Sequence, residues 1–590
     1  DPAQTDDHTW TDQGGYVEGF EGIFDPGGFA LSADDIQPMD PLFHWVLHCS
    51  REALRDADLA PRPGQGLKDM GLRAGAVLGN LSYPSASLSQ LAEAEWLDLL
   101  EPGFLGGRAR ELAKIHKPHP LNRYMSGLPA LMLSHALGLE AGAFCLDAAC
   151  SSSLYAIKLA CDALQDRRAD LMLAGGVNRA DDLFIHIGFC ALQAMSRTGQ
   201  SRPFHQGADG LVPAEGAALL LLKRYEDALA AGDNIVGVIR AVGLSNDGQG
   251  RGLLAPCPLG QERALRQAYQ MCDLTPDQVS LVECHATGTP VGDVAEVQSM
   301  ARVFGGLADL PVGSLKSNLG HLITASGAAG IQKVLAAMEA GIRPPTLHVE
   351  QPLAEFHGTP LRPLAQAEPW DSDGPRVAAI NNFGFGGNNA HLLLQEHRPG
   401  EPVTFMPPME ARPAPPSGEV AIVGLQALVA DGQGTADFAR TLFSGQSGLG
   451  TDAQGLQGGV CREIPLPLTG LRFPPADLDE TLAQQLLLFR AALLARAEVE
   501  KLPTGSTGVL IGMQCDAEVG RYGARLRMPQ WAKEWADGLG LELPEGWVER
   551  ARQGISGLRR SAGVVGAMPN IPANRINSQL DLEGPSFTVS

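Results

Sequence analysis

The chain has 590 residues, of which 44% are hydrophobic and 19% are charged, and its formal net charge is −22. This length exceeds one domain and suggests about four domain-equivalents at ~150 residues each. The negative charge argues against non-specific binding to nucleic acid or an anionic membrane. No apolar run approaches the ~20 residues needed to span a bilayer, and the polar start, DPAQTDDHTW, lacks a signal-peptide pattern. We therefore expect a cytoplasmic protein.

Ten cysteines are spread over the chain without CxxC spacing or zinc-type pairs. Such usage is typical of reduced cysteines that are buried as small apolar residues. Cys49, Cys161, Cys272 and Cys515 fit that interpretation, whereas Cys150 stands in a different context.

Cys150 follows a predicted strand and precedes a predicted helix. The residues AFCLDAAC form an apolar run that ends in small residues, and SSSLYAIKLACDALQD continues with helical periodicity, placing Leu154, Ile157 and Cys161 on one face. Backbone N–H groups and the helix dipole at such a turn predict a lowered thiol pKa and a better nucleophile. A structural cysteine at a helix start explains this segment alone equally well.

Two later segments place histidines at the ends of predicted strands. LVECHATGTPVGD carries His285 at its strand–loop junction, and VGSLKSNLGHLITASGAAG carries Lys316 and His321 in the loop before a helix. Folds of the α/β type collect their chemistry at strand ends. A lone histidine there is usually structural, but two with a lysine and the turn cysteine are hard to explain by packing. No metal site is predicted, because no third ligand stands at a zinc-type spacing.

The segment AAINNFGFGGNNAHLLLQ predicts a strand, a glycine-rich turn and a second strand. Gly384, Gly386 and Gly387 permit positive φ values and close approach of a ligand to the backbone. Taken alone, this segment favours a simple tight hairpin. It is not a phosphate loop, because no GK[ST] follows the glycines.

Internal similarity and a proline-rich stretch divide the chain. AGAVLGNLSYPS resembles TGVLIGMQCDAE, and LMLSHALGLEAGAFCLD matches RINSQLDLEGPSFTVS. Pairing Leu139 with Leu582 gives an offset of 443 residues, which places the counterpart of Cys150 three residues past Ser590. We therefore predict a first domain at 1–397 that lacks its opening strand, a proline-rich extended linker at 398–417, and the front part of a related domain at 418–590. EVAIVGL is expected to form the first strand of that second domain.

The segments DAACSSSL, ECHATGTPVGD, KSNLGHL and NNFGFGGNNAH together resemble the four signature segments of β-ketoacyl synthases, in the branch of multifunctional polyketide and fatty acid synthases. The resemblance covers about Gly14 to Glu396 and includes SRPFHQGADGLVPAEGAALLLLKR, which is similar to the segment joining the halves of that fold. It implies an α/β, thiolase-like fold with duplicated halves layered α-β-α-β-α. A ketosynthase followed directly by a ketosynthase-like domain resembles the ketosynthase–chain length factor pair of bacterial polyunsaturated fatty acid synthases.

The resemblance also implies roles in decarboxylative Claisen condensation, in which a malonyl unit extends an acyl thioester. Cys150 would be the acylated nucleophile, and His285 and His321 would stabilise the malonyl-derived enolate. Lys316 would organise the two histidines electrostatically. In pairs of this kind the second domain lacks the nucleophile and shapes the tunnel that limits chain length.

Further roles are implied for the backbone and for two threonines. The N–H groups of Cys150 and Phe385 would form an oxyanion hole, and Phe385 would gate acyl access. Thr287 and Thr289 would bind the pantetheine arm of an acyl carrier protein. The chain departs from the family at Asn388, where the family has Thr, and in LVPAEGA, where it has GFVxGEGA.

The resemblance implies partners and no bound cofactor. The phosphopantetheine arm of acyl carrier protein domains, including a malonyl-loaded one, would deliver substrate, and pairing would be intramolecular, homodimeric or both. Carrier proteins are acidic, so we expect a local Lys/Arg patch near the entrance despite the negative total charge. RARELAK, with Arg108, Arg110 and Lys114, is a candidate, although a solvated helix face explains it as well.

Three other functions remain open from sequence. The chain could be a ketosynthase of a modular polyketide synthase, or a catalytically silent length-gauge or scaffold module. A thiolase acting on free CoA substrates is the third, although thiolases use a second cysteine late in the chain and NNFGFGGNNAH has none.

Overall fold

The computed structural model describes residues 7–81, 85–100, 119–401, 403, 420–451, 455 and 457–590. Most of the predicted linker at 398–417 and the whole basic stretch with Arg108, Arg110 and Lys114 lie outside these residues. Residues 7–401 are called the N-terminal region below, and residues 420–590 the C-terminal region. None of the described helices is long and apolar enough to cross a membrane.

The first sheet of the N-terminal region is mostly parallel and buried. β1 pairs in parallel with both β2 and β3, and β4 pairs antiparallel with β3. Because helices cover both faces, β1 and β3 are buried along their whole length and read as continuous apolar runs. Two helices, α2 and α5, pack on the outer face. The bounds are β1 Ala74–Asn80, β2 Ala143–Asp147, β3 Leu171–Asn178, β4 Gly216–Leu222, α2 Pro41–Asp56 and α5 Leu128–Leu137.

The second sheet repeats this plan with the order β5-β12-β11-β6-β7-β9. Its outer face is covered by α9 and α10, whose apolar side chains form a separate core with those of the sheet. The bounds are β5 Gly237–Asn246, β6 Leu281–Glu283, β7 Leu310–Gly313, β9 Leu361–Pro363, β11 Val377–Gly384, β12 Asn388–Glu396, α9 Pro258–Gln270 and α10 Pro290–Phe304. In this half β5 lies beside β12, whereas no described strand lies beside the matching edge of β4.

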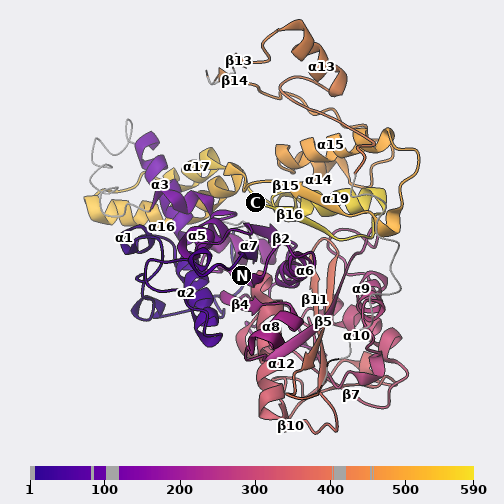
Figure 1. Ribbon diagram of the computed structural model, residues 1–590. Coiled ribbons are helices and arrows are strands. Elements are labelled where there is room, and N and C mark those ends of the chain that lie inside the picture. Colours follow the sequence, from indigo (N-terminus) through magenta and orange to yellow (C-terminus); the bar gives the residue numbers. More distant parts are fainter. Residues whose placement is uncertain are drawn as a thin grey trace.

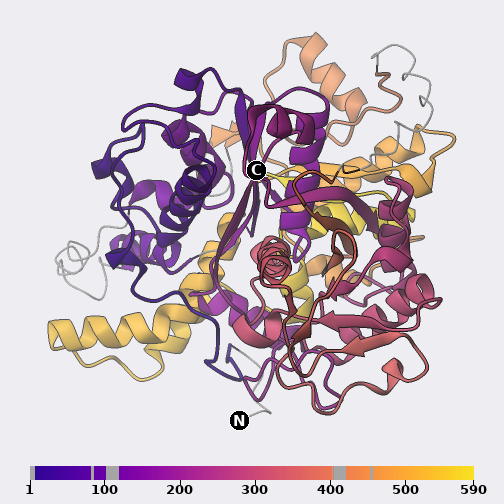
Figure 2. The ribbon, with the colours of Figure 1, turned by 60° about the horizontal axis from the view of Figure 1, so that its bottom comes forward.

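Two helices, α6 (Ser152–Gln165) and α12 (Ser326–Ala340), fill the space between the sheets. Small residues allow this close packing, since a Cβ on Gly327 of α12 would lie 2.7 Å from Cγ of Leu154 on α6. The resulting layers alternate α-β-α-β-α, as predicted, with the first half in indigo to magenta and the second in pink to orange (Figures 1 and 2). The predicted thiolase-like architecture is confirmed.

The C-terminal region adds two strands to the first sheet instead of forming a sheet of its own. β16 (Ser586–Val589) pairs antiparallel with β2, and β15 (Val509–Gly512) pairs in parallel with β16. Val589, the counterpart of Leu146 at the offset of 443, lies opposite Leu146 itself. The two copies of this strand are therefore related by a local two-fold axis at that residue pair. The helix before β16, α19 (Ile571–Leu580), begins and ends 443 residues after α5.

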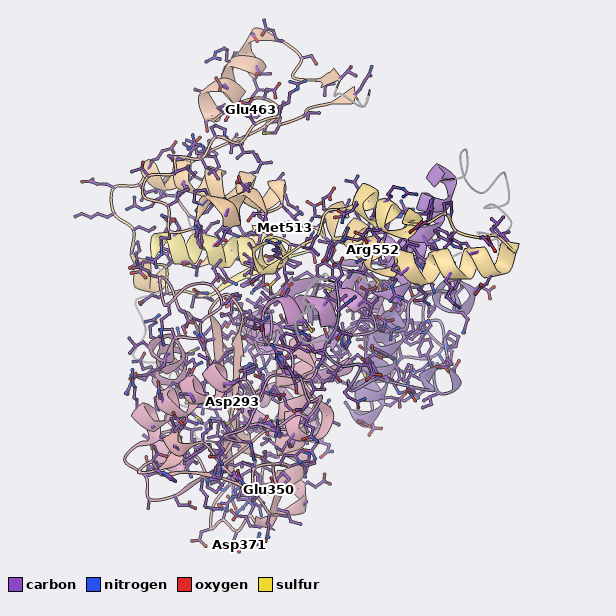
Figure 3. The ribbon with its side chains drawn as sticks, turned by 180° about the vertical axis from the view of Figure 1, so that it is seen from behind. Asp293, Glu350, Asp371, Glu463, Met513 and Arg552 are labelled. Carbon is purple, nitrogen blue, oxygen red and sulfur yellow. The ribbon has the colours of Figure 1, made fainter. Side chains whose placement is uncertain are left out.

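The remaining elements of the C-terminal region surround these strands. In the back view, Met513 just past β15 and Arg552 of α17 mark the part that lies against the N-terminal region (Figure 3). A buried ion cluster joins the regions there, because Asp7 contacts Arg525 at 2.8 Å and also Arg552. The bounds are α14 Pro475–Asp479, α15 Ala483–Ala497, α16 Ala517–Leu539, α17 Trp547–Ile555 and α18 Ser561–Val565, with α3 Ala86–Leu100 packed against α16.

An arm that includes α13 (Thr435–Ser444) projects from the body at the top of Figure 1, and Glu463 marks it in Figure 3. The predicted strand in EVAIVGL is wrong, because residues 420–425 have no strand structure. The side chains of Val420 and Ile422 are 94% and 86% exposed. A strand requires a partner for its backbone groups, and none of the described strands pairs with this segment.

Candidate active site

Cys150 lies at a tight turn between β2 and α6, as its sequence context predicts. Ala149 just before it has a φ of 53°, a left-handed conformation that costs a non-glycine residue about 1 kcal/mol. Two side chains hold the turn, since Ala149 N–H donates to Asp147 Oδ1 at 2.8 Å and Ala148 N–H donates to Ser152 Oγ at 2.9 Å. The carbonyl of Cys150 accepts from Asn382 Nδ2 at 2.8 Å. The turn therefore directs a nearly buried thiol towards the second sheet.

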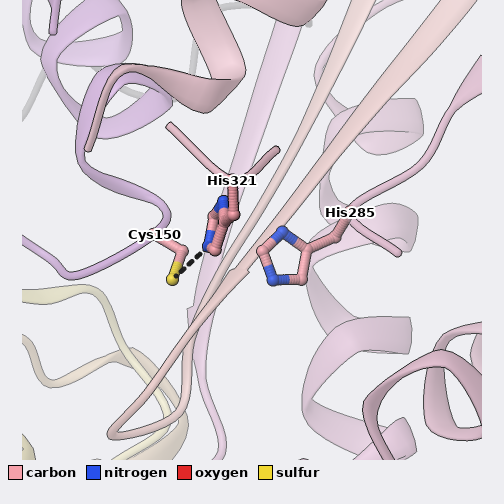
Figure 4. Close-up of side chains that lie close together, drawn as sticks. All are labelled: Cys150, His285 and His321. Carbon is pink, nitrogen blue, oxygen red and sulfur yellow. Dashed lines mark hydrogen bonds between the residues drawn. The ribbon is translucent and has the colours of Figure 1, made fainter. Parts of the chain in front are cut away.

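His321 contacts the Cys150 sulfur directly. Its Nε2 lies 3.0 Å from Sγ (Figure 4), while its Nδ1 accepts a hydrogen bond from Ile323 N–H at 3.3 Å. A neutral imidazole carries one proton, so occupation of Nδ1 as an acceptor assigns that proton to Nε2. His321 thus points an N–H donor at the sulfur and at any group that takes its place.

His285 faces the same space from the end of β6. Sγ of Cys150 and one ring nitrogen of each histidine all lie within 4.8 Å of one another. The backbone on either side is held by buried Glu296, which accepts from His285 N–H at 2.8 Å and from Ala286 N–H at 2.7 Å. Asn381 also donates to Glu296, at 2.9 Å. The backbone that carries His285 is thus held by a carboxylate on α10.

Lys316 lies in the same buried cluster, and its charge acts on all three groups. Its Nζ donates to the Cys284 carbonyl at 3.5 Å. Burial lowers the pKa of Lys316, whereas the nearby carboxylates of Glu283 and Glu296 raise it. Burial, followed by the charge of Lys316, lowers the pKa of both His285 and His321 well below the usual histidine value. Both imidazoles are therefore neutral at pH 7.

The predicted lowering of the Cys150 pKa is wrong. Burial raises the pKa of the Cys150 thiol to about 12, although the charge of Lys316 and the Phe385 N–H each lower it. Removal of the sulfur from water penalises the charged form more than these groups favour it. Cys150 therefore rests as a thiol in the substrate-free site.

No third ligand stands at a zinc-type spacing along the chain. The fold brings Cys150 beside both histidines, so three ligand atoms do come together. A cation bound there would face the Lys316 ammonium, which acts on the same three side chains. The absence of a metal stays a prediction.

The glycine-rich turn between β11 and β12 lies against the Cys150 turn. A Cβ on Gly384 would lie 2.7 Å from the Ala148 carbonyl and 3.2 Å from the Cys150 nitrogen. Gly386 and Gly387 have φ values of 92° and 91°, which side-chain-bearing residues rarely adopt. The predicted hairpin is therefore also a close backbone contact that brings the Phe385 N–H to the sulfur.

These groups open into one cavity of about 220 Å³. Its lining includes Cys150, His285 and His321 together with Thr287 and Thr289, and Val291, which is 61% exposed, marks its rim. The hydroxyls of the two threonines lie 3.1 Å apart. The structure thus brings together the predicted nucleophile, histidines, threonines and glycine turn in a single pocket.

Several residues of the site were not predicted from the sequence. Asn381 and Asn382 are visible in NNFGFGG but carry no signal of their direction. Glu296, and Asp247, which lines the cavity, lie in ordinary helix and strand-end contexts. Residues of α18 and α19, more than 400 positions from Cys150, contact Phe385 beside the site, and no local pattern could have assigned them there.

The sequence matches the family profile "Beta-ketoacyl synthase, N-terminal domain" over residues 1–228 and again over 417–590, and the profile "Beta-ketoacyl synthase, C-terminal domain" over 236–350. The chain belongs to the β-ketoacyl synthase family. The double match to the N-terminal profile agrees with the repeated α5–β2 and α19–β16 units.

Similar proteins come from two kinds of synthase. The chain is 32% identical over 558 residues to a polyunsaturated fatty acid synthase subunit of Thraustochytrium sp., covering 88% of this chain and 26% of that protein. It is 36% identical over 397 residues to "Polyketide synthase GfsA" of Streptomyces halstedii, covering 66% of this chain and 5% of that protein. The β-ketoacyl synthase chain thus spans a small part of these curated relatives.

Among solved structures, "PfaC Keto synthase-Chain length factor" superposes with a TM-score of 0.86 at 30% identity. That match covers 100% of this chain and 66% of the other. A ketosynthase from module 6 of the bacillaene synthase of Bacillus subtilis superposes with a TM-score of 0.54 at 31% identity and covers 64% of this chain. The ketosynthase–chain length factor architecture therefore accounts for both regions.

Proposed function

We propose that this chain catalyses decarboxylative Claisen condensation of an acyl thioester with malonyl-acyl carrier protein, within a polyunsaturated fatty acid synthase. The observation that carries this proposal is the convergence of the Cys150 thiol and the two neutral imidazoles in one cavity. We also propose that the phosphopantetheine arm of acyl carrier protein delivers both substrates. The activity is then that of a β-ketoacyl-[acyl carrier protein] synthase.

The first half-reaction transfers an acyl group to Cys150. The sulfur attacks the thioester carbonyl, a C–S bond to Cys150 forms, and the C–S bond to the carrier breaks. The thiol proton of Cys150 ends on the departing pantetheine sulfur. The N–H groups of Cys150 and Phe385 stabilise the oxyanion formed in between.

The second half-reaction forms the carbon–carbon bond. The malonyl C–C bond breaks, carbon dioxide leaves, and the electron pair passes to an enolate whose oxygen accepts hydrogen bonds from His285 and His321. The enolate carbon then attacks the acyl carbonyl, the C–S bond to Cys150 breaks, and the departing Cys150 sulfur takes up one proton from solvent, which restores the thiol. Neutral imidazoles suit this task because they donate hydrogen bonds without neutralising the enolate by protonation.

The alternatives fit the observations less well. A modular polyketide synthase ketosynthase leaves the C-terminal region unexplained, because the match to GfsA covers 66% of the chain while the match to the polyunsaturated fatty acid synthase relative covers 88%. A silent length-gauge module has no need for Cys150, His285, Lys316 and His321 in one buried cluster. We propose that the C-terminal region shapes the tunnel that limits the length of the acyl chain.

The carrier protein is proposed to dock beside the cavity rim. Arg202 flanks the rim loop, since a Cβ on Gly288 would lie 3.4 Å from the Arg202 backbone. Arg197 donates at 3.4 Å to Gln193, which lines the cavity. These two arginines join the basic stretch at Arg108 to Lys114, which lies outside the described residues, as candidates for the docking patch. Carrier affinity should weaken with added salt, and affinity independent of salt would contradict this assignment.

Intact-protein mass spectrometry tests the condensation itself. The chain is incubated with an acyl-pantetheine thioester and then with malonyl-acyl carrier protein, while release of carbon dioxide is followed. We expect one acyl group on Cys150 and its loss when carbon dioxide is released. Absence of acylation, or unchanged acylation of Cys150→Ala, would overturn the proposal. The domain limits 1–397, 398–417 and 418–590, homodimer formation and a cytoplasmic location stay predictions.

A further inference from the structure

The turn that carries Phe385 is covered by the C-terminal region. Val565, Met568 and Ile571, at the end of α18 and the start of α19, are buried in one cluster with side chains of the N-terminal region. The partners of that cluster are Leu192, Leu253, Leu254 and Phe385. The gate of the candidate active site therefore rests on residues from both regions.

Asn570 makes the closest polar contact across this junction. Its side chain is 0% exposed, and its Nδ2 donates to the Phe385 carbonyl at 2.7 Å. The N–H of Gly386, in the same peptide group, donates to the Leu253 carbonyl at 2.8 Å. This peptide group is therefore held at both ends, which fixes the backbone directly after the Phe385 N–H.

A second amide, Asn574, packs on the same turn one helical turn later. A Cβ on Gly386 would lie 2.1 Å from Asn574 Nδ2. The Asn574 Oδ1 accepts from Asn246 Nδ2 at 3.1 Å and from Ser586 Oγ at 2.8 Å. Asn388 joins this buried network, because its Oδ1 accepts from Asn246 Nδ2 at 3.0 Å and lies 2.9 Å from Ser586 Oγ, whose single proton it shares with Asn574. The departure from threonine at Asn388 therefore provides a contact between the regions.

The internal repeat shows that these amides are not needed to build the helix. At the offset of 443, Asn570 corresponds to Gly127 and Asn574 to Leu131 of α5. The matching helix of the N-terminal region thus starts without either side chain. If the two asparagines were needed only to fold the helix, both α5 and α19 would be expected to carry them. They occur only in α19, which packs on the glycine-rich turn that carries Phe385.

We propose that Asn570 and Asn574 are positioning residues through which the C-terminal region holds the Phe385 turn in the geometry that accepts an acyl group on Cys150. This inference rests on the proposed condensing function. Oxyanion donors act only when they are held within a few tenths of an ångström of the productive position. The C-terminal region accordingly supports catalysis in the N-terminal region as well as bounding its tunnel.

The test compares three variants on the complete chain. Asn570→Ala removes the donor, and Asn570→Asp keeps the shape while placing an acceptor against the Phe385 carbonyl. Asn577→Ala is the matched control, because Asn577 is also 0% exposed on α19 but its Nδ2 donates within its own region, to the Gly584 carbonyl at 3.3 Å. Acylation of Cys150 by an acyl-pantetheine thioester and alkylation by iodoacetamide are timed in parallel.

We expect both Asn570 variants to slow acylation about 10- to 100-fold, as misplacement near a reacting centre does. Alkylation, which needs no oxyanion hole, should change less than about twofold, and Asn577→Ala should leave both rates near wild type. Equal loss in Asn570→Ala and Asn577→Ala, or an unchanged acylation rate in both Asn570 variants, would overturn the inference. Failure of the wild-type chain to become acylated would instead contradict the proposed function.

Hydrogen–deuterium exchange gives a second readout that does not depend on activity. Amides of residues 385–388 should exchange faster in Asn570→Ala than in wild type, and should stay unchanged in Asn577→Ala. Unchanged exchange at this turn in Asn570→Ala would show that the contact does not hold it.

Discussion

The two regions share one structural unit but divide the chemistry unequally. All 14 histidines lie within residues 1–397, together with Cys150 and Lys316. The C-terminal region contributes two strands, a cover for the Phe385 turn and a buried ion cluster. The two copies of the fold therefore share the sheet that joins them. The N-terminal copy carries the reactive groups, and the C-terminal copy provides packing and hydrogen bonds around them.

The sharpest test of this division compares one cysteine from each region. Cys150→Ala should lower condensation by at least about 10⁴-fold, because no other group can hold the acyl chain as a thioester at this position. Cys515→Ala, in the C-terminal region, should stay within about twofold of wild type. Product formation from acyl and malonyl carrier thioesters is the measurement. Comparable losses in both variants would mean that the chemistry is shared between the regions.

The pH dependence of alkylation tests the burial of the nucleophile. The thiolate is the reactive form, and burial raises the pKa of Cys150 to about 12. The thiolate fraction should therefore rise about tenfold per pH unit, giving about 1,000-fold faster iodoacetamide labelling at pH 10 than at pH 7. Glutathione provides the control, since an ordinary thiol approaches a plateau above its pKa of about 8.5. A plateau for Cys150 below pH 9 would instead support the lowered thiol pKa that the helix start predicted.

Substitutions of His321 test whether this residue acts on the enolate as a hydrogen-bond donor or as a base. His321→Ala should slow decarboxylation of malonyl-acyl carrier protein about 10²- to 10³-fold, because the Nε2–H donor is lost. His321→Gln, which can present an amide N–H, should recover part of that loss. His397→Ala, at the edge of the same region, is the control. A glutamine variant as slow as the alanine variant would favour a proton-transfer role for His321.

The last comparison concerns the stability of the junction between the regions. Asp7→Ala leaves Arg525, which is 2% exposed, without its carboxylate partner. Loss of one member of a buried ion cluster should cost about 3–5 kcal/mol of unfolding free energy, measured by urea denaturation. Lys533→Ala removes an exposed pair on the same helix α16 and should cost under about 1 kcal/mol. Equal costs would mean that the buried cluster does not stabilise the junction.

The sequence predicted alternating strands and helices because those signals were local and periodic, whereas the layered arrangement was implied by the resemblance to β-ketoacyl synthases. The apolar runs of β1 and β3, the helix after Cys150 and the glycines between β11 and β12 each follow from short-range patterns. It also predicted the repeat, since the offset of 443 residues relates α5 to α19 and β2 to β16. It failed for EVAIVGL, because a strand depends on a neighbouring edge that local composition cannot show.

The sequence alone could not predict the pKa of Cys150 or the tautomer of His321. Position at a helix start suggested a lowered Cys150 pKa, whereas burial, a property of the packed structure, raises it. The tautomer of His321 depends on one backbone N–H of Ile323. Neither effect has a signal along the chain.

The sequence by itself therefore determined which side chains could react, through motifs whose residue types suit acyl transfer and enolate stabilisation. Tertiary structure alone decided that these side chains meet in one cavity and that residues of α18 and α19 pack on the Phe385 turn beside it. The physical reason is that chemical type is a local property of each residue. Proximity, desolvation and hydrogen-bond direction arise only when distant segments pack together.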